Sequence, residues 1–148
     1  MKLRIMLADD HALFRGALSA FLKLNADIEV VAEVGNGLDV LREFDGSRPQ
    51  VVCMDIGMDG LDGIEATRQL LAIAPDVKVI GLSAQVDRFN VAALFAAGAL
   101  GYVVKGSAAG ELLKAIRTVS QGRNYFDPAL DITDLAELTP YTTGTARR

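Results

Sequence analysis

The chain has 148 residues, of which 51% are hydrophobic and 23% are charged, a balance that suits one domain with a buried core and excludes disorder over most of the length. A net charge of −4 excludes a diffuse attraction to nucleic acid or anionic lipid, and the single cysteine excludes an internal disulfide. Because we find no signal peptide and no apolar run long enough to span a membrane, we expect a soluble cytoplasmic protein.

Five short segments rich in apolar and β-branched residues predict β-strands. Each is too short for a typical helix, and none shows the alternation of polar and apolar residues that marks a strand with one exposed face. We therefore expect both faces of the sheet to be buried. The predicted strands cover residues 3–8, 28–34, 51–54, 77–82 and 101–104.

The longer segments that follow these strands show helical periodicity. Apolar side chains recur at intervals of three and four residues over 14–21, and similar patterns cover 64–74 and 112–119. Pro75 marks a point where a helix must end. Strands that alternate with helices predict an α/β fold, in which parallel strands form one sheet with helices on both faces.

Polar residues follow four of the five predicted strands. Asp9 and Asp10 follow the first strand, Asp55 the third, Ser83 the fourth and Lys105 the fifth. In a parallel sheet of this kind, the ligand site lies beyond the carboxyl ends of the strands. We therefore expect these five side chains to share one site, with the second strand at an edge of the sheet.

Three carboxylates in one pocket repel each other, at a cost of about 3 kcal/mol for each pair at roughly 5 Å and an effective dielectric constant near 20. Mg²⁺ would offset this repulsion, because it prefers oxygen ligands. With a lysine and a hydroxyl beside it, a carboxylate can accept a phosphoryl group and form an acyl phosphate. Taken singly, Asp10 could instead cap a helix, Ser83 could be a turn residue and Lys105 could be a solvated lysine.

Four stretches of sequence resemble the receiver domains of two-component response regulators. The closest resemblance is to the NarL/FixJ subfamily, whose receivers precede a LuxR-type helix-turn-helix domain. The resemblance implies a flavodoxin-like fold with five parallel strands in the order 2-1-3-4-5 and five helices. The four stretches are LADDHALFR at 7–15, MDIGMDGLDG at 54–63, GALGYVVK at 98–105 and QGRNYFDPAL at 121–130.

The resemblance assigns Asp55 as the phosphoacceptor, which takes its phosphoryl group from a sensor histidine kinase. It also implies a Mg²⁺ site made by Asp9, Asp10, Asp55 and the backbone carbonyl of Gly57. Such a domain phosphorylates itself and at most slowly dephosphorylates itself, so we do not expect a turnover enzyme. Asp59 stands where the family often has proline, which adds a carboxylate beside this loop.

The resemblance further implies that Ser83 and Lys105 bind phosphoryl oxygens, and that Ser83 and Tyr102 act as switch residues. In the family, phosphorylation changes the face formed by the fourth helix, the fifth strand and the fifth helix, through which many members form homodimers. We therefore expect a switched interaction surface that, in a parent protein, controls transcription.

We place the receiver domain at 1–122 and a linker or tail at 123–148. Leu138, Thr139 and Pro140 resemble the start of the subfamily's DNA-binding domain, but eight residues after them are too few for a helix-turn-helix domain. We therefore expect DNA binding only through an output domain outside this sequence.

Three other functions fit parts of the pattern. An aspartyl phosphatase would need a second acid two residues after Asp55, where Gly57 stands instead. A receiver-like module could bind partners without phosphorylation, and Asp59 keeps this alternative open. A flavodoxin-type electron carrier shares the architecture, but its flavin phosphate would be repelled by the carboxylates.

Overall fold

The structure is a computed structural model that describes residues 2–107 and 109–130. Strands and helices alternate along the chain, as the sequence predicts. Their bounds are β1 (Leu3–Ala8), α1 (Ala12–Lys23), β2 (Ile28–Val34), α2 (Gly37–Ser47), β3 (Val51–Asp55), α3 (Gly63–Ile73), β4 (Lys78–Ser83), α4 (Arg88–Ala96), β5 (Gly101–Val104), α5 (Ala109–Ser120) and β6 (Tyr125–Phe126).

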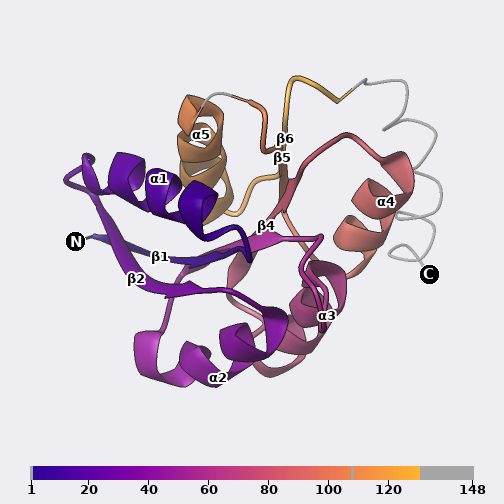
Figure 1. The fold of residues 1–148 in the computed structure, drawn as a ribbon, viewed down its shortest axis with the longest axis horizontal. Coiled ribbons are helices and arrows are strands. Elements are labelled where there is room, and N and C mark those ends of the chain that lie inside the picture. Colours follow the sequence, from indigo (N-terminus) through magenta and orange to yellow (C-terminus); the bar gives the residue numbers. More distant parts are fainter. Residues whose placement is uncertain (1, 108, 131–148) are drawn as a thin grey trace.

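The strands of the described part of the chain form one parallel sheet in the order β2-β1-β3-β4-β5-β6. Helices α1 and α5 cover one face of this sheet, and α2, α3 and α4 cover the other (Figure 1). The predicted doubly wound fold and the order of its first five strands are therefore confirmed. The short strand β6 is an addition to the five predicted strands.

The core has two layers, one on each side of the sheet. Successive side chains of a strand point to opposite faces, so Ile5 and Leu7 belong to the layer under α1 and α5, whereas Met6 and Ala8 belong to the layer under α2, α3 and α4. All five residues of β3 are buried. In β3, the lack of polar alternation therefore reflects burial on both faces, whereas the edge strand β2 is only partly buried.

Side chains of polar residues fix where several helices begin. Asn36, Asp62 and Asp87 each accept a hydrogen bond from a backbone N–H in the first turn of α2, α3 and α4, respectively. Helix α1 begins after His11, and no side chain within the described residues caps it. Asp10 therefore does not act as the helix cap that its position also allowed.

The segment after α5 packs against the edge of the sheet. The N–H of Tyr125 donates to the carbonyl of Leu100 at 3.0 Å, and the N–H of Asp127 donates to the carbonyl of Tyr102 at 3.0 Å. The side chain of Leu130 is buried in the core layer beneath α2, α3 and α4. The described fold thus continues past residue 122, where we expected a linker to begin.

Leu138, Thr139 and Pro140, with the rest of the predicted tail from 131 onward, lie outside the described residues. In the part of the chain that is described, we find no helix with the length and apolarity that a membrane crossing requires.

Candidate functional site

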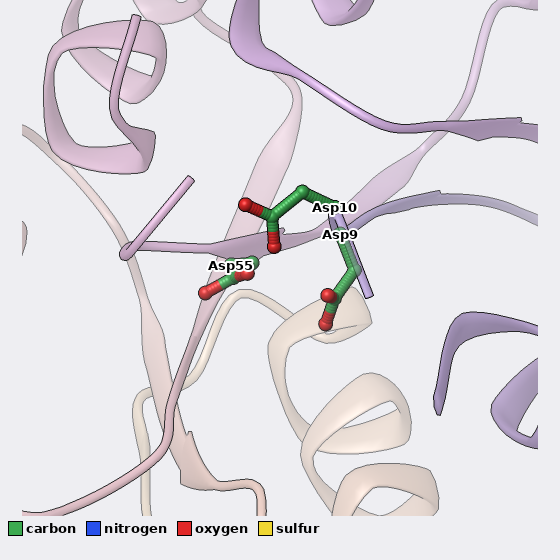
Figure 2. Close-up of side chains that lie close together, drawn as sticks. All are labelled: Asp9, Asp10 and Asp55. Atoms are coloured by element: carbon green, nitrogen blue, oxygen red, sulfur yellow. The ribbon is translucent and has the colours of Figure 1, made fainter. Parts of the chain in front are cut away.

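Three aspartates meet at the carboxyl ends of β1 and β3 (Figure 2). Asp9 and Asp10 directly follow β1, and Asp55 is the last residue of β3. One carboxylate oxygen from each lies within 4.8 Å of the others. Asp9 and Asp55 are buried, at 1% and 4% exposure, whereas Asp10 is exposed. The structure therefore brings together the predicted acidic residues.

Local hydrogen bonds orient the two buried carboxylates. Oδ1 of Asp9 accepts a hydrogen bond from the N–H of His11 at 2.8 Å, and Oδ1 of Asp55 accepts one from the N–H of Gly57 at 2.9 Å. Helix α3 begins close to this loop, since a Cβ at Gly63 would lie only 2.2 Å from the carbonyl oxygen of Asp55. A glycine at 63 therefore lets α3 start against the end of β3.

Lys105 lies between the two buried carboxylates. Its Nζ is 2.8 Å from Oδ2 of Asp9 and 3.1 Å from Oδ2 of Asp55, and its side chain is 15% exposed. The ring of Phe14 on α1 is 5.1 Å from the same Nζ, measured to its centroid. The lysine that follows β5 is thus an internal partner of the acidic cluster rather than a solvated surface residue.

The pKa values at the site reflect burial and these charges. Burial raises the pKa of Asp55 above its ordinary value, although the hydrogen bonds from Gly57 and Lys105 oppose that rise. Burial alone would lower the pKa of Lys105, but its contacts with Asp9 and Asp55 outweigh burial and leave the pKa raised. Lys105 is therefore a firmly protonated group beside a carboxylate that is costly to ionise.

The donor set at this site suits a divalent cation. Three carboxylates and one ammonium give a formal charge of −3 + 1 = −2, and the groups free to bind a cation are oxygens. Hard oxygen donors with excess negative charge are what Mg²⁺ prefers. The residues present therefore fit the magnesium ion that the sequence predicts.

A cavity of about 330 Å³ opens beside the aspartates. Ser83, the last residue of β4, is buried, and its Oγ donates to the carbonyl of Gln85 at 2.7 Å. The fully buried Tyr102 donates from its hydroxyl to the same carbonyl at 3.0 Å. The cavity is lined by residues of β3, β4 and α4 and of the loops that follow β1, β3, β4 and β5: Asp10, His11, Asp55, Ile56, Gly57, Ser83, Ala84, Gln85, Asp87, Asn90 and Lys105.

Several residues at the site were not assigned a role from sequence. The guanidinium of Arg15 donates to the backbone carbonyl of Asp9 and lies 3.8 Å from Glu33 of β2, so it fixes the backbone between the acidic pair and the edge strand. Asp87 and Asn90 at the start of α4 line the cavity. Helical periodicity predicts which face of a helix is buried, but it does not predict which polar side chain reaches a neighbouring loop.

Comparison with known proteins identifies this arrangement. Residues 5–117 match the response regulator receiver domain family. The chain belongs to this family. The transcriptional regulatory protein LiaR of Bacillus subtilis is 42% identical over 120 residues, which are 81% of this chain and 57% of LiaR. The transcriptional regulatory protein DegU of Brevibacillus brevis is 38% identical over 127 residues, 86% of this chain and 54% of DegU.

Solved receiver structures share the fold of this chain. A LuxR-family two-component response regulator from Aurantimonas superposes with a TM-score of 0.86 at 31% identity, covering 93% of this receiver and 97% of that chain. The signal receiver domain of NarL from Mycobacterium tuberculosis gives a TM-score of 0.78 at 30% identity, over 82% of this receiver and 98% of that domain. The predicted family and its LuxR/NarL affinity are confirmed, and this receiver spans little more than half the length of LiaR and DegU.

Proposed function

We propose that this receiver accepts a phosphoryl group on Asp55 from a sensor histidine kinase, with Mg²⁺ bound by the acidic cluster. The observation that supports this proposal is the position of Lys105, whose ammonium contacts Asp55 and Asp9 beside a cavity that the Asp55 side chain lines. A carboxylate at that position can reach a bound phosphoryl group while a positive charge lies next to it.

In this mechanism, a carboxylate oxygen of Asp55 attacks phosphorus, and the bond from phosphorus to the nitrogen of the kinase phosphohistidine breaks. The electron pair of that bond stays on the histidine ring, and the product is an aspartyl phosphate. Lys105 then pairs with a phosphoryl oxygen. Oγ of Ser83 can leave the carbonyl of Gln85 and donate its hydrogen bond to another phosphoryl oxygen.

We propose Asp9, Asp10 and Asp55 as ligands for Mg²⁺. The backbone carbonyl of Gly57, a residue that lines the cavity, would be a further oxygen ligand. When bound, the ion would neutralise negative charge on the phosphoryl oxygens. Asp59 is exposed and is not a member of the acidic cluster in this structure, so we assign it no ligand role.

The carbonyl of Gln85 gives a physical basis for the proposed switch. It accepts hydrogen bonds from both Ser83 and Tyr102, so movement of the Ser83 hydroxyl toward phosphate changes the hydrogen bonding of Tyr102. We propose that this change alters the face around α4, β5 and α5, where a second copy of the receiver binds. In a parent protein of the LiaR and DegU kind, DNA would be bound by an output domain outside this chain.

The test is the intact mass of the protein after incubation with acetyl phosphate and Mg²⁺. We expect the mass of one phosphoryl group in the wild type, none in Asp55→Asn, and an unchanged result in the exposed control Asp59→Asn. An unmodified wild type would contradict the proposal. Steady release of phosphate from a phosphomonoester would favour an aspartyl phosphatase instead.

A further inference from the structure

Asp127 is a buried carboxylate outside the proposed phosphorylation site. It directly follows β6 and is 2% exposed. Burying a carboxylate is costly unless hydrogen bonds replace its lost hydration. The hydrogen bonds that Asp127 accepts therefore indicate what this buried carboxylate does in the fold.

Described residues donate three hydrogen bonds to this carboxylate. Oδ2 accepts from the backbone N–H of Val104 at 2.8 Å and from Oγ of Ser107 at 2.8 Å. Oδ1 accepts from the backbone N–H of Ala129 at 2.8 Å. Bonds to an ionised acceptor are stronger than those between neutral groups, so Asp127 fastens Val104, Ser107 and Ala129 together.

Two of these donors flank Lys105 in the sequence. Val104 immediately precedes Lys105, and Ser107 follows it by two residues, so the carboxylate holds the backbone on both sides of the lysine. The Lys105 side chain extends from this backbone to Asp9 and Asp55. Because a displacement of about 1 Å in a reacting or positioning group can slow a reaction by about a hundredfold, the rigidity of this backbone matters to the chemistry.

The other contacts of this segment fasten the chain where it leaves the domain. The N–H of Asp127 donates to the carbonyl of Tyr102, and the ring of Phe126 lies 5.2 Å from that of Phe95 on α4. Leu130 is buried in the core. One short segment thus contacts β5, α4 and the backbone that carries Lys105.

We propose that Asp127 is a positioning residue for Lys105, and that it couples the phosphorylation site to the packing of residues 125–130 against β5. The coupling rests on the proposed phosphorylation of Asp55. Energetic coupling between two equilibria is reciprocal: if phosphorylation shifts the equilibrium by which this segment packs on β5, packing of the segment shifts the phosphorylation equilibrium by the same free energy.

The test compares Asp127→Asn with the wild type for the rate constant of phosphorylation at saturating acetyl phosphate and for Mg²⁺ affinity measured by calorimetry. We expect the rate to fall about tenfold while Mg²⁺ affinity is unchanged. The Asn amide has one acceptor oxygen, so its NH₂ group must face either the N–H of Ala129 or the pair of donors from Val104 and Ser107. Ser107→Ala removes one donor and has a smaller effect. Asn36→Ala, which removes a helix cap far from β5, controls for general destabilisation and leaves the rate unchanged.

A second readout needs no phosphodonor. In amide NMR spectra without Mg²⁺, we expect Asp127→Asn and Ser107→Ala to shift the resonances of Lys105 and Asp55, and Asn36→Ala to leave them in place. Equal phosphorylation rates in Asp127→Asn and the wild type would overturn the coupling. A slower Asp127→Asn that has also lost a matching share of its Mg²⁺ affinity would overturn it too. A wild type that is never phosphorylated, with these shifts present, would contradict the proposed function and leave the positioning role standing.

Discussion

The ammonium of Lys105 allows Asp9 and Asp55 to be buried side by side. Each carboxylate loses hydration on folding, and each recovers part of that loss from the same Nζ, at 2.8 Å and 3.1 Å. Removing one partner of a buried ion pair leaves an uncompensated charge, which is costlier than the pair is favourable. Lys105 therefore contributes both to the proposed chemistry and to the stability of the metal-free domain.

We predict that Lys105→Met lowers the free energy of unfolding by about 3 kcal/mol without Mg²⁺, as measured by urea denaturation. Lys114 supplies the control, because its side chain is exposed although it pairs with Glu111, and Lys114→Met should change stability by no more than about 0.5 kcal/mol. Equal effects of the two substitutions would show that Lys105 is not an internal ion-pair partner.

Burial keeps the thiol of Cys53 protonated. It is fully buried in β3, and burial raises its pKa to about 12. A folded pKa above the unfolded value favours the protonated native state, so this contribution to stability is complete below about pH 9 and is lost as the pH rises toward 12.

We therefore predict that native Cys53 resists a thiol reagent at pH 8 and reacts at the rate of unfolding. Above pH 9, the Cys53 thiol should lower the free energy of unfolding by at most about 1.4 kcal/mol per pH unit. In Cys53→Ala, the free energy of unfolding should fall less steeply with pH, because this contribution is absent. Rapid labelling of the native protein would contradict the burial of this thiol.

The sequence predicts the site residues as a set because they share one structural property: they stand at the carboxyl ends of parallel strands. Asp9, Asp55 and Lys105 could be grouped in this way before any contact was known. Asp127 could not, since it follows a two-residue strand with no periodicity, and two of its three donors lie 20 and 23 residues away in the chain. The periodicity around Arg15 predicts a helix, but it does not predict that the Arg15 side chain donates to the carbonyl of Asp9.

At the scale of the elements, close approaches between strands and helices depend on glycine. A Cβ at Gly81 of β4 would lie 2.1 Å from Cδ2 of Leu94, so α4 packs against this strand only because the position lacks a side chain. By contrast, a Cβ at Gly16 of α1 would meet nothing within 4 Å. The two glycines therefore differ in what a methyl group would do.

We predict that Gly81→Ala lowers the free energy of unfolding by about 1–3 kcal/mol and displaces α4, because Leu94 must move. Gly16→Ala should instead stabilise the protein by about 0.5–1 kcal/mol, since alanine is favoured inside a helix. Thermal denaturation measures both. Equal and small effects would contradict the close packing of α4 on β4.

Strand β6 is the element that could not be predicted from sequence. The five longer strands are rich in apolar and β-branched residues, whereas Tyr125 and Phe126 form a pair too short for any period to be read. The strand forms because the edge of β5 offers unpaired backbone groups, which the N–H groups of Tyr125 and Asp127 satisfy. The edge position of β2, which sequence did predict, is confirmed.

For the whole molecule, binding of Mg²⁺ should raise the free energy of unfolding. An ion that binds the folded protein alone raises the free energy of unfolding by about 2.7 kcal/mol at one hundred times its dissociation constant. We predict that Mg²⁺ raises the melting temperature of the wild type and of Asp59→Asn, but not of Asp10→Ala, which removes an exposed member of the acidic cluster. An equal rise in all three proteins would place the ion elsewhere.

The central claim is that Asp55 carries the phosphoryl group, and chemical trapping tests it most directly. Borohydride reduces an aspartyl phosphate to homoserine, so we would treat the protein with acetyl phosphate and Mg²⁺, reduce it and map its peptides by mass spectrometry. We predict homoserine at position 55 and unmodified Asp9, Asp10 and Asp59. Homoserine at any of those three positions, or at none of the aspartates, would contradict it.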